Sequence, residues 1–292
     1  MKPAPFAYYA PTTLDEALSL LSEHGYDAKV LAGGQSLVPM MNFRIAQPAV
    51  LVDINNISDL AYINAEEGGV RVGALTRHHQ SETSPVMARH APLIYSTMPK
   101  IAYPQVRTRG TFGGSLSHAD PSAELPTLTT TLDAKFRLVS QRGERWVSAS
   151  EFFIGLYTTA LEPDEILVEG FVPELPPRSG WSLQEVNRRK HDFALAGVAA
   201  VLTLDESGIC QDARLVFLSV GDRPMYAERA SNLLKGQTLT PEAIRAATEL
   251  ATTEEIDPGD DIHATADFRR HLAKTLCQRA IEQAHQRAQG KQ

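Results

Sequence analysis

Two pairs of consecutive glycines place the strongest constraint on how this chain can fold and what it can bind. Gly33-Gly34 lies in the string AGGQS at residues 32–36, and Gly113-Gly114 lies in the string TFGGS at residues 111–115. Glycine adopts backbone angles that are closed to other residues, and it lets a ligand approach the main chain closely. Consecutive exposed N–H groups in such a turn can cradle an anion such as a pyrophosphate, and neighbouring hydroxyls can add hydrogen bonds. Each pair alone is also compatible with an ordinary turn.

Neither string matches the two common nucleotide-binding patterns. The G-x-G-x-x-G spacing of dinucleotide-binding folds is absent, and so is the Gly-Lys-Ser/Thr ending of a P-loop. Those two types of fold are therefore not supported.

The N-terminal region has the pattern of a β-α-β unit. A helix is expected to begin at Thr13, whose hydroxyl can cap it, and to end near Gly25. Buried strands are expected at residues 29–32 and 50–54, and they should pair in parallel. Further apolar runs predict strands at 70–74, 135–139, 145–147 and 165–172, with a helix over 91–102.

The rest of the chain follows a Pro-rich stretch at residues 172–177, which is the best candidate for a linker. Two apolar runs at 198–204 and 213–220, separated by a short polar turn, predict an antiparallel hairpin. Helices are expected over 241–255 and from 266 to about 288.

Composition narrows the class of protein. With 292 residues, 43% hydrophobic and 22% charged, the chain is expected to be globular with two or three domains. A net charge of −7 without a basic run makes nucleic acid an unexpected partner, and no apolar run is long enough to span a bilayer. The start has no apolar signal core, so we expect a cytoplasmic protein. Two isolated cysteines cannot hold an iron–sulfur cluster.

The residues around the glycine pairs resemble a known family. The strings LAGGQSLVPMMNFRIAQPAVLVDINNI and IAYPQVRTRGTFGGSLSHADPSAELP are similar to the FAD-binding subunits of the molybdenum hydroxylases, which include carbon monoxide dehydrogenase, quinoline oxidoreductase and the flavin region of xanthine dehydrogenase. The resemblance covers nearly the whole chain and extends through FFIGLYTTALEPDEILVEGFVP and RRKHDFALAGVAA.

This resemblance implies a fold of mixed class, α/β and then α+β. A two-domain FAD-binding fold of the vanillyl-alcohol-oxidase or PCMH type would be followed by a C-terminal α+β domain with a small antiparallel sheet and helices. We place the domains at residues 1–57, 58–177 and 178–292. FAD would lie, without a covalent bond, between the first two domains, and the glycine strings would hold its pyrophosphate from opposite sides through main-chain N–H groups and hydroxyls.

Carried over residue by residue, the resemblance implies a cofactor site and no catalytic or metal-binding residue. The implied cofactor-binding residues are Lys29, Val30, Leu31, Ala32, Gly33, Gly34, Gln35, Ser36, Ile101, Thr111, Phe112, Gly113, Gly114, Ser115, Glu124, Leu167, Asp192 and Phe193.

For several of these residues a simpler structural interpretation is also open. Glu124 would accept hydrogen bonds from flavin sugar or ribitol hydroxyls, or it could be a solvated loop acid, and Asp120 is a weaker candidate for the same role. Ile101 and Leu167 could lie near the cofactor or simply pack in the core. The ring of Phe193 would approach the isoalloxazine.

The remaining charged and histidine residues near these strings are also open to more than one interpretation. Arg107 and Arg109 could balance phosphate charge or face a partner subunit. We expect His118 to form no covalent flavin link, and we expect His78 and His79 to be a surface pair without a metal.

The implied function is electron transfer within a larger enzyme. This chain would take electrons from the 2Fe-2S clusters of an iron–sulfur small subunit and pass them to an external acceptor, while the molybdenum cofactor would lie in a large subunit. The assembly would be a dimer of heterotrimers. Two alternatives stay open: a self-sufficient flavin oxidase acting on its own small substrate, and a flavin-free assembly protein.

Overall fold

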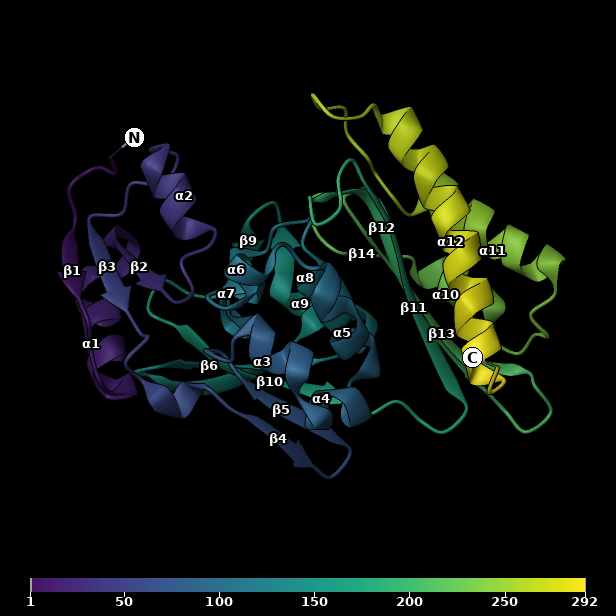
Figure 1. Ribbon diagram of the computed structural model, residues 1–292, viewed down its shortest axis with the longest axis horizontal. Helices are drawn as coiled ribbons and strands as arrows, with labels where there is room; N and C mark the ends of the chain where they lie inside the picture. Colours follow the sequence, from purple (N-terminus) through teal and green to yellow (C-terminus); the bar gives the residue numbers. More distant parts are fainter. Residues whose placement is uncertain (1, 292) are drawn as a thin grey trace.

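The computed structural model describes residues 2–291 and is elongated, with an N-terminal, a middle and a C-terminal unit in a row (Figure 1). The N-terminal unit has a parallel three-stranded sheet in the order β1-β3-β2. Its elements are β1 (Ala7–Tyr9), α1 (Leu14–His24), β2 (Ala28–Leu31), α2 (Leu37–Asn42) and β3 (Val50–Asp53).

Helix α1 of the N-terminal unit packs against the sheet of the middle unit. The Thr13 hydroxyl accepts the Glu16 N–H at 3.2 Å, and the Glu16 carboxylate accepts the Thr12 N–H at 2.9 Å, which satisfies two free donors at the helix start. The apolar face of α1, with Leu18 and Leu21 fully buried, packs in one cluster with Ile166 and Val168 of β10 in the middle unit and with residues of β3. Burial of each leucine contributes roughly 1.5–3 kcal/mol.

The middle unit has a five-stranded antiparallel sheet in the order β4-β5-β10-β6-β7, and short helices cover one face of it (Figure 1). Its strands are β4 (Ile63–Glu66), β5 (Gly69–Gly73), β6 (Lys135–Ser140), β7 (Gly143–Ser148) and β10 (Ile166–Pro173), with a small hairpin of β8 (Phe153–Gly155) and β9 (Thr158–Thr159). Its helices are α3 (His78–Thr83), α4 (Pro85–His90), α5 (Pro92–Thr97), α6 (Pro104–Arg107), α7 (Phe112–His118), α8 (Glu124–Thr131) and α9 (Ala149–Phe152).

Strand β10 contributes to two cores at once. Leu167 and Val172 belong to the core between the middle sheet and its helices, whereas Ile166 and Val168 belong to the N-terminal core with α1. A register shift between Leu167 and Glu169 accompanies this change of face.

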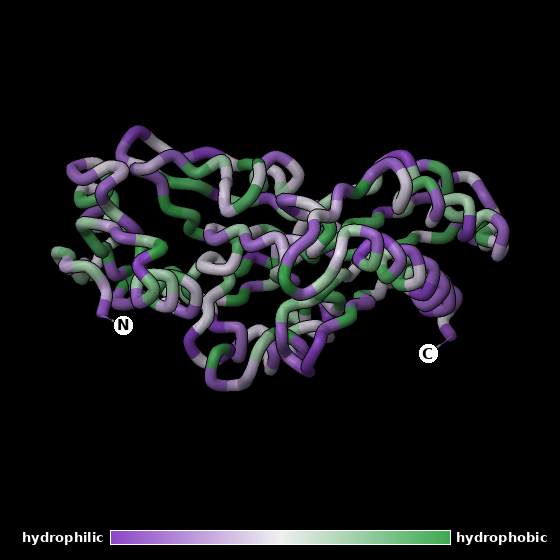
Figure 2. The backbone as a smooth tube through the Cα atoms, turned by 90° about the horizontal axis from the view of Figure 1, so that it is seen from above, coloured by the Kyte–Doolittle hydropathy of each residue, from purple (hydrophilic) through white to green (hydrophobic). Residues whose placement is uncertain are grey.

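The C-terminal unit is a four-stranded antiparallel sheet, β11-β12-β13-β14, packed against helices. Its elements are β11 (Ser179–Asn187), β12 (Ala194–Leu204), β13 (Cys210–Leu218), β14 (Met225–Tyr226), α10 (Glu228–Leu234), α11 (Pro241–Glu254) and α12 (Ala266–Ala288). Helix α12 lies so close to the sheet at Gly180 that a Cβ atom there would collide with the main chain of Ala284 and Ala288. In Figure 2 the outer turns of this helix are hydrophilic, while hydrophobic segments run through the interior.

The predicted mixed α/β class and the C-terminal antiparallel sheet with helices are confirmed. The hairpin is β12–β13, and the two long helices are α11 and α12. Strands β1, β4 and β11 were not predicted, because the first two are mostly exposed and the third is rich in polar residues. The helix expected over 91–102 is only Pro92–Thr97, since Pro99 lacks the N–H needed to continue it.

The three larger sheets fall within the three predicted domain ranges, while the boundaries at 57 and 177 stay predictions. Among residues 2–291, no helix is both long and apolar enough to cross a bilayer.

Arg269 anchors the start of α12 to the C-terminal sheet. Its guanidinium donates to the carbonyls of Leu195 at 2.5 Å and Ser219 at 3.2 Å, and it forms an ion pair with Asp261 at 2.6 Å. The side chain is almost fully buried, and the carbonyls that it satisfies lie at the start of β12 and the end of β13.

Replacing Arg269 by Ala should lower the free energy of unfolding by about 2–4 kcal/mol, because carbonyl oxygens would be left buried without donors. Urea denaturation of the full chain measures this effect. Arg245→Ala, which removes an exposed ion pair with Glu242, is the matched control and should change stability by less than about 0.5 kcal/mol. Equal effects of the two substitutions would contradict the anchoring role.

Candidate cofactor site

The first glycine loop exposes a run of unused main-chain donors. It connects β2 to α2, and Gly34 at its turn has a φ of +69°, in the left-handed region that favours glycine. Within the described chain, the N–H groups of Gly33, Gly34, Gln35 and Ser36 donate to no acceptor. A run of free N–H groups in a turn is a binding site for anionic oxygens.

The second glycine loop uses its donors internally. The N–H groups of Phe112 and Gly113 donate to the carbonyls of Thr76 and Ala74, at 2.9 and 2.8 Å. The hydroxyl of Thr111 caps α7 by accepting the Gly114 N–H at 3.1 Å. These glycines therefore serve chain packing: a Cβ at Gly113 would lie 2.5 Å from that of Ala74.

The resemblance implied that both loops would donate main-chain hydrogen bonds to the pyrophosphate. Most N–H groups of the second loop are engaged inside the protein, so main-chain donation to a ligand falls chiefly to the first loop. The Ser115 hydroxyl, which forms no hydrogen bond with any described residue, stays available.

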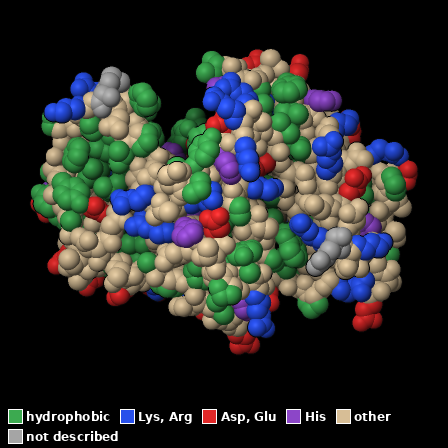
Figure 3. All heavy atoms as spheres, in the orientation of Figure 1, with side chains coloured by type: hydrophobic (Ala, Val, Ile, Leu, Met, Phe, Trp, Pro, Cys, Tyr) green, Lys and Arg blue, Asp and Glu red, His purple; other side chains and the backbone are tan. Residues whose placement is uncertain are grey.

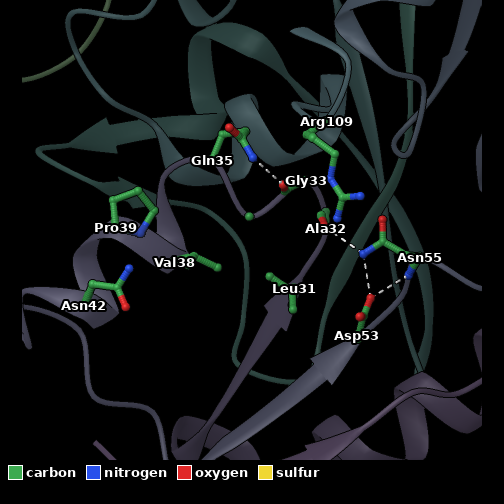
Figure 4. A pocket seen from close by; sticks show the side chains of 11 residues that line it. Leu31, Ala32, Gly33, Gln35, Val38, Pro39, Asn42, Asp53, Asn55 and Arg109 are labelled. Carbon is green, nitrogen blue, oxygen red and sulfur yellow. Dashed lines mark hydrogen bonds between the residues drawn. The ribbon is translucent and has the colours of Figure 1, made fainter. Parts of the chain in front are cut away.

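A pocket lies where the first loop meets the segment just before the second loop, although the two loops come from different sheets. A Cβ at Gly33 would collide with the main chain of Arg109 and Gly110, and a Cβ at Gly114 would lie 3.8 Å from that of Ala32. The pocket has a volume of about 390 Å³. It is lined by Leu31, Ala32, Gly33, Gly34, Gln35, Val38, Pro39, Asn42, Asp53, Asn55 and Arg109 (Figure 4). In Figure 3 a notch separates the N-terminal part from the rest, and basic side chains gather below it.

A chain of hydrogen bonds connects the two loops. The Asn55 amide donates to the Ala32 carbonyl at 2.8 Å and to the Asp53 carboxylate at 2.6 Å (Figure 4). Its oxygen accepts from one arm of the Arg77 guanidinium at 2.7 Å. The other arm of Arg77 donates to the Arg109 carbonyl at 2.5 Å.

The charges at the pocket favour an anion. Burial acts to raise the pKa of Asp53, but hydrogen bonds from Tyr8 and Asn55 and the charge of Arg109 outweigh it, so the pKa lies below its ordinary value. Burial, followed by the charge of Arg109, lowers the pKa of Arg77. The Arg109 guanidinium donates to no group in the described chain. Two cations thus flank one carboxylate beside the free N–H groups.

Arg107 is engaged inside the protein. Its buried guanidinium pairs with both carboxylate oxygens of Glu82, at 2.9 and 3.0 Å. It also donates to the carbonyls of Ile101 and Ala102. The charge of Arg107 is therefore paired within the chain, whereas Arg109 lines the pocket.

The prediction of a surface histidine pair is wrong for His78 and confirmed for His79. His79 is exposed, but the His78 ring is buried and bonds the Thr111 carbonyl through Nε2 at 2.9 Å. Burial lowers the pKa of His78, so the ring stays neutral and supports the second loop. No signal in the local sequence distinguishes the two neighbours.

Glu124 is buried at the start of α8, so the alternative of a solvated loop acid is wrong. Burial raises the pKa of its carboxyl to about 8, and the charge of Glu185 acts in the same direction. Burial also raises the pKa of Glu185, whose Oε2 has no hydrogen-bond partner among the described residues.

The other implied residues do not line the pocket. Ile101 and Leu167 are buried in the middle core, and so is Phe112, while contact of all three with the cofactor stays a prediction. Asp192 and Phe193 lie on the loop between β11 and β12, and the Phe193 side chain is 67% exposed. The remaining implied residues outside the pocket are Lys29, Val30, Ser36, Thr111, Gly113, Gly114, Ser115 and Glu124.

Several pocket residues were not predicted. Asp53 ends β3 and Asn55 follows it. Because β3 pairs in parallel with β2, its carboxyl end lies at the same edge as the first loop, which is a usual place for a ligand. That signal was present in the predicted parallel pairing. Val38, Pro39 and Asn42 come from α2. Residues 2–291 contain no group of three side chains suited to hold a metal ion.

Comparison with known proteins gives consistent matches. Residues 4–175 match the family model "FAD binding domain in molybdopterin dehydrogenase", and residues 181–284 match "CO dehydrogenase flavoprotein C-terminal domain". The chain is 40% identical to the 6-hydroxypseudooxynicotine dehydrogenase complex subunit alpha of Paenarthrobacter nicotinovorans, over 99% of this chain and 97% of that protein.

Solved structures agree in fold. A chain of reconstituted CO dehydrogenase from Oligotropha carboxidovorans superposes with a TM-score of 0.95 at 36% identity, covering 98% of this chain and 100% of that one. A chain of quinoline 2-oxidoreductase from Pseudomonas putida 86 gives 0.92 at 40% identity, with 99% of each chain covered. The protein therefore belongs to the FAD-binding subunits of the molybdenum hydroxylases, the family that includes the medium chains of carbon monoxide dehydrogenases.

Proposed function

We propose that this chain is the electron-transfer subunit of a three-part molybdenum hydroxylase. Electrons would reach it from the 2Fe-2S clusters of a small subunit and leave to an external acceptor. The organic substrate would be hydroxylated in a molybdopterin-containing large subunit. The complex would be a dimer of heterotrimers in the cytoplasm.

The single observation that carries this proposal is the pocket between the first glycine loop and Arg109. It combines the free N–H groups of the first loop with the unpaired charge of Arg109, and a diphosphate needs both kinds of group. The apolar side chains of Leu31, Val38 and Pro39 line the same pocket and suit the uncharged parts of a nucleotide. The residues present therefore fit FAD.

Within this proposal the protein binds and orients the cofactor. Bound FAD would supply the redox chemistry, which belongs to the cofactor itself. The first loop would hold the pyrophosphate through its N–H groups, and Arg109 would balance its charge. Glu124, protonated at neutral pH, would offer an O–H donor as well as an acceptor. No residue of this chain acts as an acid or base on the organic substrate.

The test is purification of the tagged full chain from its host, with a visible spectrum, acid release of the chromophore and identification of co-purifying subunits. We expect released FAD together with a cysteine-rich small subunit and a molybdopterin-binding large one. Anaerobic bleaching of the isolated chain by an organic substrate would instead support a self-sufficient flavin oxidase. A chain that neither carries nor takes up FAD would support an assembly role.

Replacing Gly34 by Val should abolish FAD retention. The residue has a left-handed backbone, and its Cβ would lie within 3.2–3.3 Å of the Val38 and Leu31 side chains that line the pocket. Gly114→Val should act similarly, because its Cβ would lie 2.6 Å from the Thr111 hydroxyl that caps α7. Flavin content per chain after gel filtration measures both effects.

Gly208→Val is the matched control for this prediction. Gly208 is also left-handed, at φ +85°, but nothing lies within 4 Å of its Cβ position in the turn between β12 and β13. This variant carries the backbone strain without touching the pocket, so it should retain FAD. Stoichiometric flavin in Gly34→Val and Gly114→Val would show that the pocket is wrongly assigned.

Replacing Glu124 by Gln should change how stability depends on pH. The folded chain holds the Glu124 proton up to a pKa of about 8, whereas the unfolded chain releases it near 4.5. As the pH rises from about 4.5 to about 8, the free energy of unfolding of the wild type should therefore fall relative to that of the variant, by a few kcal/mol in total. Urea denaturation from pH 5 to 9 measures the difference. Glu206→Gln, at an exposed turn, should give a curve parallel to the wild type, and a parallel curve for Glu124→Gln would refute the buried proton.

A further inference from the structure

We propose that Asn55 and Arg77 are positioning residues that fix the spacing between the two glycine loops and thereby make the site selective for a flavin with a diphosphate. This inference rests on the proposed placement of FAD between the loops. We call the hydrogen-bonded pair Asn55–Arg77 the latch.

The latch holds each loop at its entry point. Asn55 holds the carbonyl of Ala32, the first residue of the AGGQS loop, at 2.8 Å. Arg77 holds the carbonyl of Arg109, shortly before the TFGGS loop, at 2.5 Å. The bond of 2.7 Å between the two side chains closes the connection from the N-terminal unit to the middle unit.

The residue types suit this task. Asparagine carries a donor and an acceptor on one side chain, so it can hold a carbonyl and receive an arginine together. The planar guanidinium places N–H groups on separate arms, which lets Arg77 reach two acceptors in a fixed geometry. Lysine has a single nitrogen and cannot reproduce that fork.

The anchors of the latch are themselves fixed. Asp53 accepts from the Asn55 side chain and main chain, at 2.6 and 2.9 Å, and from the Tyr8 hydroxyl at 2.6 Å. Arg77 is the N-cap residue of α3, and its own N–H donates to Gln80 at 2.7 Å. The latch therefore joins rigid elements, and a change in one loop is transmitted to the other.

Both direct acceptors of Arg77 are neutral, so its positive charge is not cancelled by its hydrogen bonds. The carbonyl that it holds belongs to Arg109, whose own guanidinium lines the pocket. The latch thus sets the position of both cations relative to the free N–H groups of the first loop. A ligand that binds a preorganised site loses less free energy to ordering.

Selectivity follows from the number of phosphates. FAD has a diphosphate that the first loop and Arg109 would hold together, so its affinity depends on the spacing between them. FMN has one phosphate and needs only the first loop. Removal of the latch should therefore weaken FAD much more than FMN, whereas general damage to the fold would weaken both.

The test is equilibrium titration of the flavin-free full chain with FAD and, separately, with FMN. Asn55→Ala and Arg77→Ala should each weaken FAD about tenfold to hundredfold, as expected for loss of a hydrogen bond to a charged group, and change FMN several-fold at most. Because the two residues act as one unit, the double variant should be no weaker than Arg77→Ala alone. Arg77→Lys keeps the charge and should still lose FAD selectivity.

Arg245→Ala, in the exposed ion pair on α11, is the matched control and should leave both affinities unchanged. Thermal unfolding of the flavin-free variants reports whether each one is folded. If Arg77→Ala does not fold, Asn55→Ala and Arg77→Lys decide the question. Equal losses of FAD and FMN, or an unchanged ratio, would overturn the latch. A wild-type chain that binds no FAD would overturn the proposed function instead.

Discussion

The main chain of Gly33 lies directly against the main chain of Arg109 and Gly110, with no room for a side chain between them. This contact brings a loop of the parallel sheet to a loop of the antiparallel sheet, and the pocket exists only where they meet. It requires α1 to dock on the middle sheet in one orientation, which the shared core of Leu18, Leu21 and Val168 provides. The hydrogen bonds of Asn55 and Arg77 hold the same junction.

The two glycine loops look alike in sequence but work by different physical means. In the first, a left-handed Gly34 turns the chain so that successive N–H groups stay free. In the second, Gly113 lets α7 approach the end of β5, and the N–H groups are used within the protein. The pocket is therefore asymmetric: one side offers donors, and the other offers a rigid surface and the charge of Arg109.

Short-range signals were enough to predict much of the fold. The Thr13 cap, the parallel pairing of β2 with β3, the β12–β13 hairpin and helices α11 and α12 all depend on residues close in sequence. Residues 31–35 of the pocket were also predicted, because glycines and their flanks identify the loop. The approach of Arg109 to the pocket depends on long-range contacts: Arg77 meets Asn55 and Arg109 only after two sheets have docked. The burial of His78 beside an exposed His79, and the pairing of Arg107 with Glu82, likewise have no local signature.

Strand β10 has a consequence for how the chain folds as it is made. The N-terminal unit is synthesised first, yet its core is completed by Ile166 and Val168, which emerge more than a hundred residues later. Until then the apolar face of α1 is covered only by its own sheet, which has just three strands. Exposed apolar faces and unpaired strand edges in such intermediates promote aggregation, and long-range pairing is intrinsically slow. The first residues of this protein thus depend for their folding on a strand near the middle of the chain, and a ribosome-bound fragment that ends before β10 is a natural client for a chaperone.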